Sequence, residues 1–94
     1  MSKSFCRIEK AAGEKLIIKS SFSKKWLAEF KKRISYQDRE WDHEAERWTV
    51  EGRHFAALID LAKAHFSIAV YVEGAISTDI HTGERTEQLQ LFGS

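Results

Sequence analysis

Histidines and carboxylates are the residues of this chain whose spacing comes nearest to a catalytic pattern. His43-Glu44-Ala45-Glu46-Arg47 approaches the zinc-protease motif His-Glu-x-x-His, but position 47 is arginine, which cannot be the second histidine ligand. His54 and His65 lie eleven residues apart, which is about three turns of a helix and too far to bind one ion. The sequence therefore predicts no catalytic residue, no metal site and no cofactor, and we expect a protein that is not an enzyme.

Other catalytic motifs are either missing from the sequence or incomplete in it. The sequence contains no Gly-x-x-x-x-Gly-Lys-[Ser/Thr] phosphate loop, so ATP hydrolysis is not expected. The only cysteine, Cys6, alternates with Ile8 and is expected to be a small core residue rather than a nucleophile. Asp42, Glu44 and Glu46 are the carboxylates that a metal-dependent nuclease could use, but no suitably spaced lysine accompanies them.

Composition and charge limit the class of protein further. The chain has 94 residues, of which 43% are hydrophobic, enough for one small core. No apolar run reaches the ~18–20 residues of a membrane span, and no signal-peptide pattern opens the chain, so we expect a cytoplasmic protein without membrane or small-molecule partners.

Charge is distributed unevenly along the chain. Residues 1–35 hold ten Lys or Arg and three acids, which gives a net charge of +7, whereas residues 36–94 hold five Lys or Arg and eleven acids, which gives −6. This asymmetry is typical of a chain whose basic part contacts a polyanion, although lysines that only solvate the surface give the same pattern.

Hydrophobic periodicity predicts an α+β fold. The expected order β-β-α-β-β-α-β gives one small sheet with two helices packed on one face. We expect one α+β domain over residues 1–74, and over residues 75–94 a linker or an edge strand that carries a C-terminal peptide. The expected elements are strands at 5–9 and 15–20, a helix at 24–34, strands at 39–42 and 47–51, a helix at 53–65 and a strand at 67–73.

The first predicted helix has a basic exposed side. Ser23 is its expected N-cap, and the apolar residues from Trp26 to Ile34 recur at helical spacing and form the buried stripe. Most of its cations fall outside that stripe, where they could neutralise phosphates without reading sequence. The candidate DNA contacts are Lys19, Lys24, Lys25, Lys31, Lys32, Arg33, Trp41 and Trp48. The two tryptophans belong either to the core of the hairpin or to a surface that stacks on an unpaired base.

The end of the chain carries a short motif. Gln88-Leu89-Gln90-Leu91-Phe92 resembles the motif Gln-Leu-x-Leu-Phe, which binds the sliding clamp of bacterial replication, and all four specified positions match. The resemblance implies that Leu91 and Phe92 fill an apolar pocket of the clamp, that Leu89 packs beside them and that Gln88 makes orienting hydrogen bonds. The alternative is that this segment forms a last core strand. Gly93-Ser94 is either native or a cloning remnant.

A second resemblance covers about residues 15–72. The strand Leu16-Ile17-Ile18, the helix up to Ile34 and the spacing Trp41-Asp42-x-x-x-x-x-Trp48-Thr49-Val50 resemble the HARP-type module beside annealing-helicase motors and related N-terminal modules of phage helicases. The resemblance implies DNA binding at forks or junctions. This chain has no motor motif, so such a module would act by binding alone.

Together these features favour a non-catalytic accessory of DNA replication or repair. It would bind DNA through the basic helix and the sliding clamp (the beta subunit of DNA polymerase III) through residues 88–92. The alternative is a protein-interaction or inhibitor module, for example a phage- or plasmid-encoded clamp blocker, that does not bind DNA. A small nuclease is a third possibility.

Overall fold

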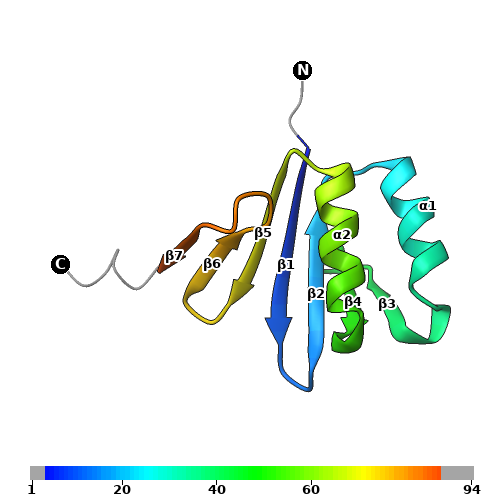
Figure 1. Ribbon diagram of the computed structural model, residues 1–94. Coiled ribbons are helices and arrows are strands. Elements are labelled where there is room, and N and C mark those ends of the chain that lie inside the picture. Colours follow the sequence, from blue (N-terminus) through cyan, green and yellow to red (C-terminus); the bar gives the residue numbers. More distant parts are fainter. Residues whose placement is uncertain (1–3, 88–94) are drawn as a thin grey trace.

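The computed structural model describes residues 4–87, which form one sheet with two helices packed on it (Figure 1). The predicted α+β class and the predicted arrangement of the helices are confirmed. Short 3₁₀ helices occupy Tyr36–Asp38 and Gly52–His54. The elements are β1 (Phe5–Ala11), β2 (Lys15–Ser20), α1 (Lys24–Arg33), β3 (Arg39–Asp42), β4 (Arg47–Glu51), α2 (Phe55–His65), β5 (Ile68–Glu73), β6 (Ile76–Asp79) and β7 (Arg85–Glu87).

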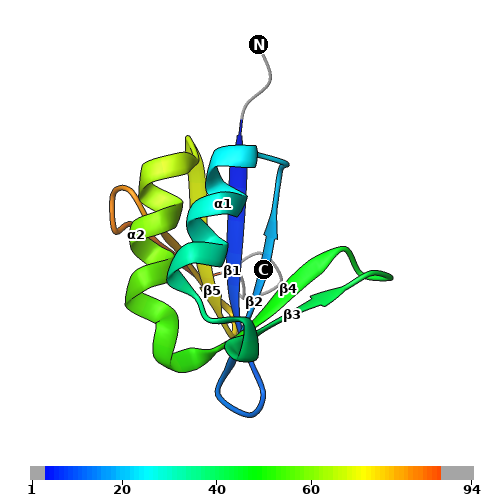
Figure 2. The same cartoon turned by 90° about the vertical axis from the view of Figure 1, so that its right-hand side faces the viewer.

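The sheet has seven strands in the order β3-β4-β2-β1-β5-β6-β7. β1 and β5 are parallel, with Phe5 opposite Ile68, and every other neighbouring pair is antiparallel. The first strand of the chain therefore lies at the centre of the sheet. Both helices cover the same face, as Figure 2 shows.

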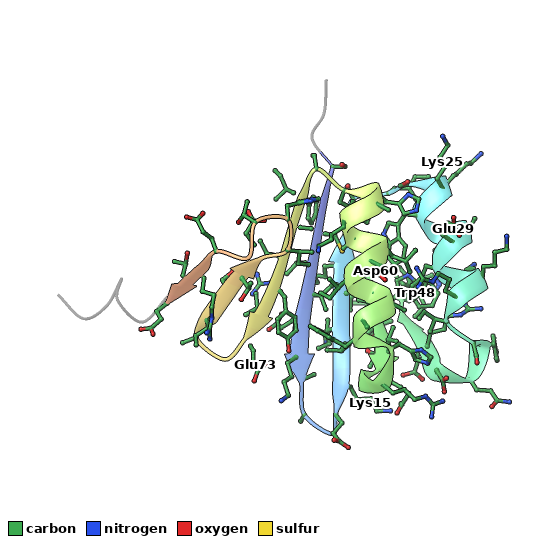
Figure 3. All side chains as sticks on the ribbon, viewed as in Figure 1. Lys15, Lys25, Glu29, Trp48, Asp60 and Glu73 are labelled. Carbon is green, nitrogen blue, oxygen red and sulfur yellow. The ribbon has the colours of Figure 1, made fainter. Side chains whose placement is uncertain are left out.

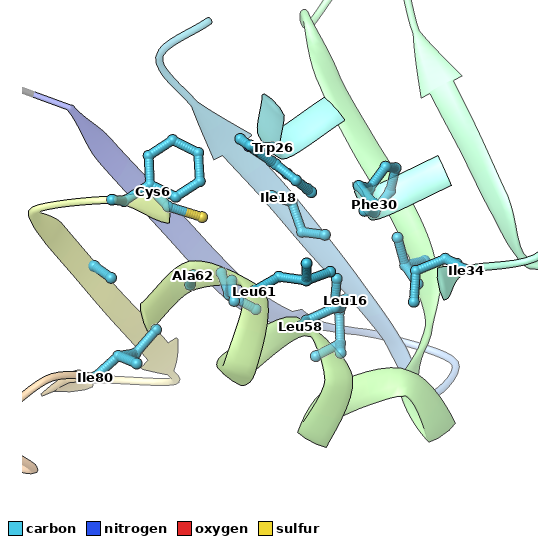
Figure 4. Packing of buried hydrophobic residues seen from close by; sticks show 14 residues of the cluster. Cys6, Leu16, Ile18, Trp26, Phe30, Ile34, Leu58, Leu61, Ala62 and Ile80 are labelled. Carbon is cyan, nitrogen blue, oxygen red and sulfur yellow. The ribbon is translucent and has the colours of Figure 1, made fainter. Parts of the chain in front are cut away.

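Alternating side chains explain which face of the sheet is covered. In β1, Cys6 and Ile8 are buried while Arg7 is exposed, and in β2 Leu16 and Ile18 are buried while Lys19 is exposed. Successive side chains of a strand point to opposite faces, so the buried set faces the helices. Between these strands and the helices lies the hydrophobic core, seen in Figure 4.

α1 begins where the sequence predicts. The Ser23 side chain accepts a hydrogen bond from the backbone N–H of Trp26 at 3.3 Å, which satisfies one of the free donors of the first turn. Trp26, Phe30 and Ile34 are buried, and the Trp26 ring packs edge-on against Phe30 at 4.5 Å between centroids and against Phe66 at 5.7 Å. The predicted stripe therefore anchors α1 to the sheet and to α2.

The second helix starts later than the sequence predicts. Residues 52–54 form a 3₁₀ turn, and the α-helix begins at Phe55 rather than Arg53. The N–H of Gly52 donates to the carbonyl of Glu14 at 2.8 Å, and a Cβ at Gly52 would lie 2.5 Å from that oxygen. Close approach of the β1–β2 turn thus requires glycine at this position.

Residues 75–87 extend the sheet. β6 pairs with β5, β7 pairs with β6, and Ile80, 7% exposed, packs into the core. Of the two alternatives that the sequence leaves open here, the structure forms strands. The candidate clamp-binding residues Gln88, Leu89, Leu91 and Phe92 lie outside the described residues. Over residues 4–87, neither helix has the length and apolar character needed to cross a membrane.

Candidate nucleic-acid interface

The exposed side of α1 carries a concentration of unpaired positive charge. The helix contains five cations and one acid, Glu29, so it has a formal charge of +4. All five cations are exposed, and within residues 4–87 none of them forms an ion pair with a carboxylate. Figure 3 shows Lys25 on the outer end of α1, pointing into solvent. The cations are Lys24, Lys25, Lys31, Lys32 and Arg33.

Four of these cations share one side of the helix. Residues of an α-helix advance about 100° each, so Lys31, Lys24, Lys32 and Lys25 fall, in that order, within an arc of about 120°. Arg33 lies outside this arc by about 80°, so its side chain does not share the direction of the four lysines. We call the four lysines the lysine face of α1, and Arg33 does not belong to it.

Four other cations, three of them on the sheet, are paired with carboxylates. Arg7 lies 3.7 Å from Glu9, and Lys10 lies 3.6 Å from Glu73. Lys15 contacts Glu51, and Arg53 contacts Asp38. These carboxylates offset the charge of the four cations locally, so they are poor candidates for a polyanion contact, whereas the lysine face has no carboxylate partner among residues 4–87.

A groove of about 740 Å³ lies next to the lysine face, where the β3–β4 hairpin diverges from β2. Figure 2 shows the hairpin projecting away from the upper part of β2. Pairing between β2 and β4 is limited to Lys15–Ile18 of β2, so the end of β2 is left beside the gap. We call this gap the tryptophan groove; its walls are formed by Phe5, Lys19, Ser20, Ser21, Phe22, Ser23, Trp26, Leu27, Lys31, Trp41, Ala45, Glu46 and Trp48.

The two hairpin tryptophans have different surroundings within this groove. Trp48 is partly buried and packs against the core, with its ring 4.9 Å from that of Phe30. Trp41 pairs with Trp48 across the hairpin, yet its side chain remains 43% exposed. Trp48 is therefore a packing residue, and Trp41 is available to a ligand.

Phe22 is the most exposed apolar side chain of the groove, at 80%. It precedes the N-cap Ser23, a position from which an apolar residue often packs on the fourth residue of the helix, here Leu27. Its high exposure shows that the Phe22 ring is instead left largely open to solvent. Phe22 lies between β2 and α1, and Trp41 lies on β3 of the hairpin. They thus present two large apolar surfaces to one groove from different elements.

Charges at the groove are mostly positive. Lys19 lies on the β2 wall and Lys31 on the α1 wall, whereas Glu46 is the only acid among the lining residues. Glu46 adopts a left-handed φ of 52° in the hairpin turn. The neighbouring Asp42 does not line the groove, and its carboxylate accepts hydrogen bonds from the N–H groups of Glu44 and Ala45 at 3.0 Å each.

The groups with altered proton affinity lie away from this groove's open surface. The hydrogen bond from Arg53 and then that with His54 lower the pKa of the Asp38 carboxyl. Burial raises the pKa of the Cys6 thiol to about 12, so the thiolate needed for nucleophilic attack is scarce at neutral pH. In residues 4–87, no group of three or more His, Cys, Asp or Glu side chains is placed to hold a metal ion.

A second cavity, of about 530 Å³, lies at the other end of β2. Lys10, Lys15 and Arg53 line it, but each already contacts a carboxylate. Burial and a hydrogen bond to Glu73 raise the pKa of Tyr71, on its wall, to about 12. Its charges are balanced internally, so this cavity offers no free cation to a ligand.

The structure brings together some of the residues that the sequence singles out. Lys19, Lys31, Trp41 and Trp48 line one groove, and Lys24, Lys25 and Lys32 adjoin it on α1. Leu27, which belongs to the predicted buried stripe, also lines the groove. Sequence reasoning missed Phe22 as a site residue. For Phe22 the available signal was a large apolar residue among three serines, Ser20, Ser21 and Ser23.

Comparison with known proteins found no match: no family model, curated protein or solved structure matches this chain. The resemblances to the HARP-type module and to the clamp-binding motif therefore rest on the quoted residues alone.

Proposed function

We propose that this protein is a non-catalytic accessory of DNA replication or repair, which contacts DNA through the lysine face of α1 and binds the bacterial sliding clamp through residues 88–92. The observation that carries the DNA contact is that four exposed lysines share one side of α1 without any carboxylate partner among residues 4–87. The HARP-like spacing of the helix and hairpin supports the same function.

The lysine face would bind by neutralising phosphates. Each phosphate contact releases condensed counterions, so affinity falls steeply with salt and depends little on sequence. Lysine makes point contacts rather than bidentate ones, which suits backbone contacts and not base recognition. Such binding by one short helix is weak, and a second attachment point would strengthen it.

Clamp binding supplies that second attachment. The clamp-binding motif follows Glu87, the last residue of β7, and β7 is the edge strand farthest along the sheet from the hairpin. β7 therefore lies at the sheet edge opposite the tryptophan groove. Because the two contacts belong to different parts of the chain, tethering by one would raise the effective concentration of the other.

The DNA contact is tested by charge removal at matched sites. We expect Lys31→Gln with Lys32→Gln to weaken binding of a labelled DNA in an anisotropy titration at low salt. Arg7→Gln with Lys10→Gln removes the same charge from the sheet and should change affinity by no more than about two-fold, because those cations are already paired. Equal losses in both variants would contradict the assignment to α1.

The clamp contact is tested separately with the intact chain and with a peptide of residues 86–94. Both should bind purified clamp with a Kd on the order of micromolar, and Leu91→Ala with Phe92→Ala should abolish binding. Clamp binding without any DNA binding would instead identify an inhibitor of the clamp. A peptide that binds while the intact protein does not would contradict the tether.

A further inference from the structure

We propose that the tryptophan groove stacks an unpaired base against Phe22 and Trp41, and that the protein thereby selects single-stranded over duplex nucleic acid. This inference rests on the proposed function, because it assumes that a nucleic acid lies along the lysine face. It goes further by naming the form of nucleic acid that is bound and the side chains that select it.

Exposure of the two aromatic rings is the first observation. Phe22 is 80% exposed and Trp41 is 43% exposed, although both are large apolar side chains in a protein with a well-filled core. Neither ring is needed to close that core, since Trp48 and Leu27 already pack against it. Aromatic faces left free in a groove are typical platforms on which bases stack.

Charge at the groove favours a nucleic acid over an apolar peptide. Lys31 lies four residues after Leu27 on the groove side of α1. Lys19 borders the groove from β2, but it alternates with the buried Ile18, so its side chain is directed to the open face of the sheet. A base inserted beside α1 would place a flanking phosphate near the Lys31 amine. The lysine face then continues along α1 and can follow the backbone beyond the groove.

The requirements of base stacking determine which form of nucleic acid we expect the groove to bind. Stacking requires the flat face of a base, and in a duplex both faces are already covered by neighbouring base pairs. A single strand presents those faces freely. The lysine face alone would bind both single-stranded and duplex nucleic acid. The groove therefore accounts for the higher affinity that we expect for the single strand.

Two matched variants test this inference. Phe22→Ala removes an exposed ring from the groove, and Tyr36→Ala removes an exposed ring, at 82%, that does not line the groove. We expect Phe22→Ala to weaken binding of a single-stranded dT oligonucleotide about five-fold or more, the low end for loss of one stacked base. Binding of a hairpin duplex should change by less than about two-fold, and Tyr36→Ala should change neither.

Tryptophan fluorescence locates the bound base. Trp26 is buried and Trp48 is partly buried, so quenching by an oligonucleotide would come mainly from Trp41. The variant Trp41→Phe removes the indole that reports on the groove, and we expect it to lose the quenching at oligonucleotide concentrations that saturate it by anisotropy. Quenching that persists in Trp41→Phe would overturn the placement of the base.

Failure of this inference and failure of the proposed function give different results. Suppose that Phe22→Ala binds single strands as well as the unchanged protein does, while Lys31→Gln with Lys32→Gln weakens binding. The groove then does not distinguish single-stranded from duplex DNA, and the DNA contact of the lysine face is retained. If neither single-stranded nor duplex DNA binds at low salt, this inference and the proposed DNA contact are both contradicted. Binding of an apolar peptide in the groove without nucleic-acid binding would likewise overturn the inference.

Discussion

Trp41 and Trp48 lie opposite each other across the β3–β4 hairpin, with ring centroids 5.3 Å apart and an interplanar angle of 58°. Although they form one pair, Trp48 also packs against Phe30 in the core, whereas Trp41 remains 43% exposed at the rim of the groove. One ring therefore anchors the hairpin to the core, and the other borders the site where we propose that a base stacks.

The two tryptophans should differ in their contribution to stability. We expect Trp48→Ala to lower the free energy of unfolding by about 3 kcal/mol, because it leaves a cavity against the core. Trp41→Ala should cost no more than about 1.5 kcal/mol, the size of one aromatic pair contact. Urea denaturation followed by circular dichroism measures both. A larger loss for Trp41→Ala would show that the exposed ring is the structural one.

Removal of the acid in the groove should strengthen DNA binding. Glu46→Gln keeps the size of the side chain and removes a negative charge, which near a phosphate costs about 1 kcal/mol in water. We expect the affinity for a single-stranded oligonucleotide to rise about two- to five-fold at low salt. Glu87→Gln, on β7 at the opposite edge of the sheet, is the control and should have little effect. An unchanged affinity in Glu46→Gln would place the phosphates away from the hairpin.

Asp38 should make stability depend on acid pH. The pKa of its carboxyl is lowered below the ordinary 3.8 by the hydrogen bond from Arg53 and then by that with His54. Since the folded pKa is the lower one, this stabilisation is present above about pH 4 and is lost as the pH falls through the folded value. Asp38→Asn should therefore be less stable than the unchanged protein at pH 7, and the difference should shrink towards pH 3. A difference that is constant over this range would contradict the ionic role of Asp38.

Cys6 should report unfolding through its reactivity. The thiol is 3% exposed, and burial raises its pKa to about 12. We expect a disulfide reagent such as DTNB to leave the native protein unmodified over minutes at pH 8 and to titrate one thiol in guanidinium chloride. Rapid labelling of the native protein would mean that β1 opens locally.

Local elements of this fold could be predicted from the sequence because their signals are local. Alternation of Leu16 and Ile18 predicted β2, and Ser23 with the stripe from Trp26 predicted the start and the buried side of α1. The parallel pairing of β1 with β5 joins segments about sixty residues apart, and no local pattern encodes it. β7 is short, polar and exposed, so it lacked the periodic signal of a strand.

The candidate site was predictable only in part, for a related reason. Exposed lysines of α1 follow from helical spacing, but the groove arises where the hairpin diverges from β2, which is a tertiary feature. The separate environments of Trp41 and Trp48 depend on which of them meets Phe30. Phe22 gained significance only once it was seen to share a groove with Trp41.

The central claim is that the lysine face of α1, which has no carboxylate partner among residues 4–87, binds DNA. The most direct test is the salt dependence of binding by the intact protein. We predict that log K for a labelled single-stranded oligonucleotide falls linearly with log salt with a slope of about −3, since four lysines contribute about −0.7 each. The slope should flatten by about 1.4 in Lys31→Gln with Lys32→Gln. Absence of binding at low salt, or an affinity that does not change with salt, would contradict the account.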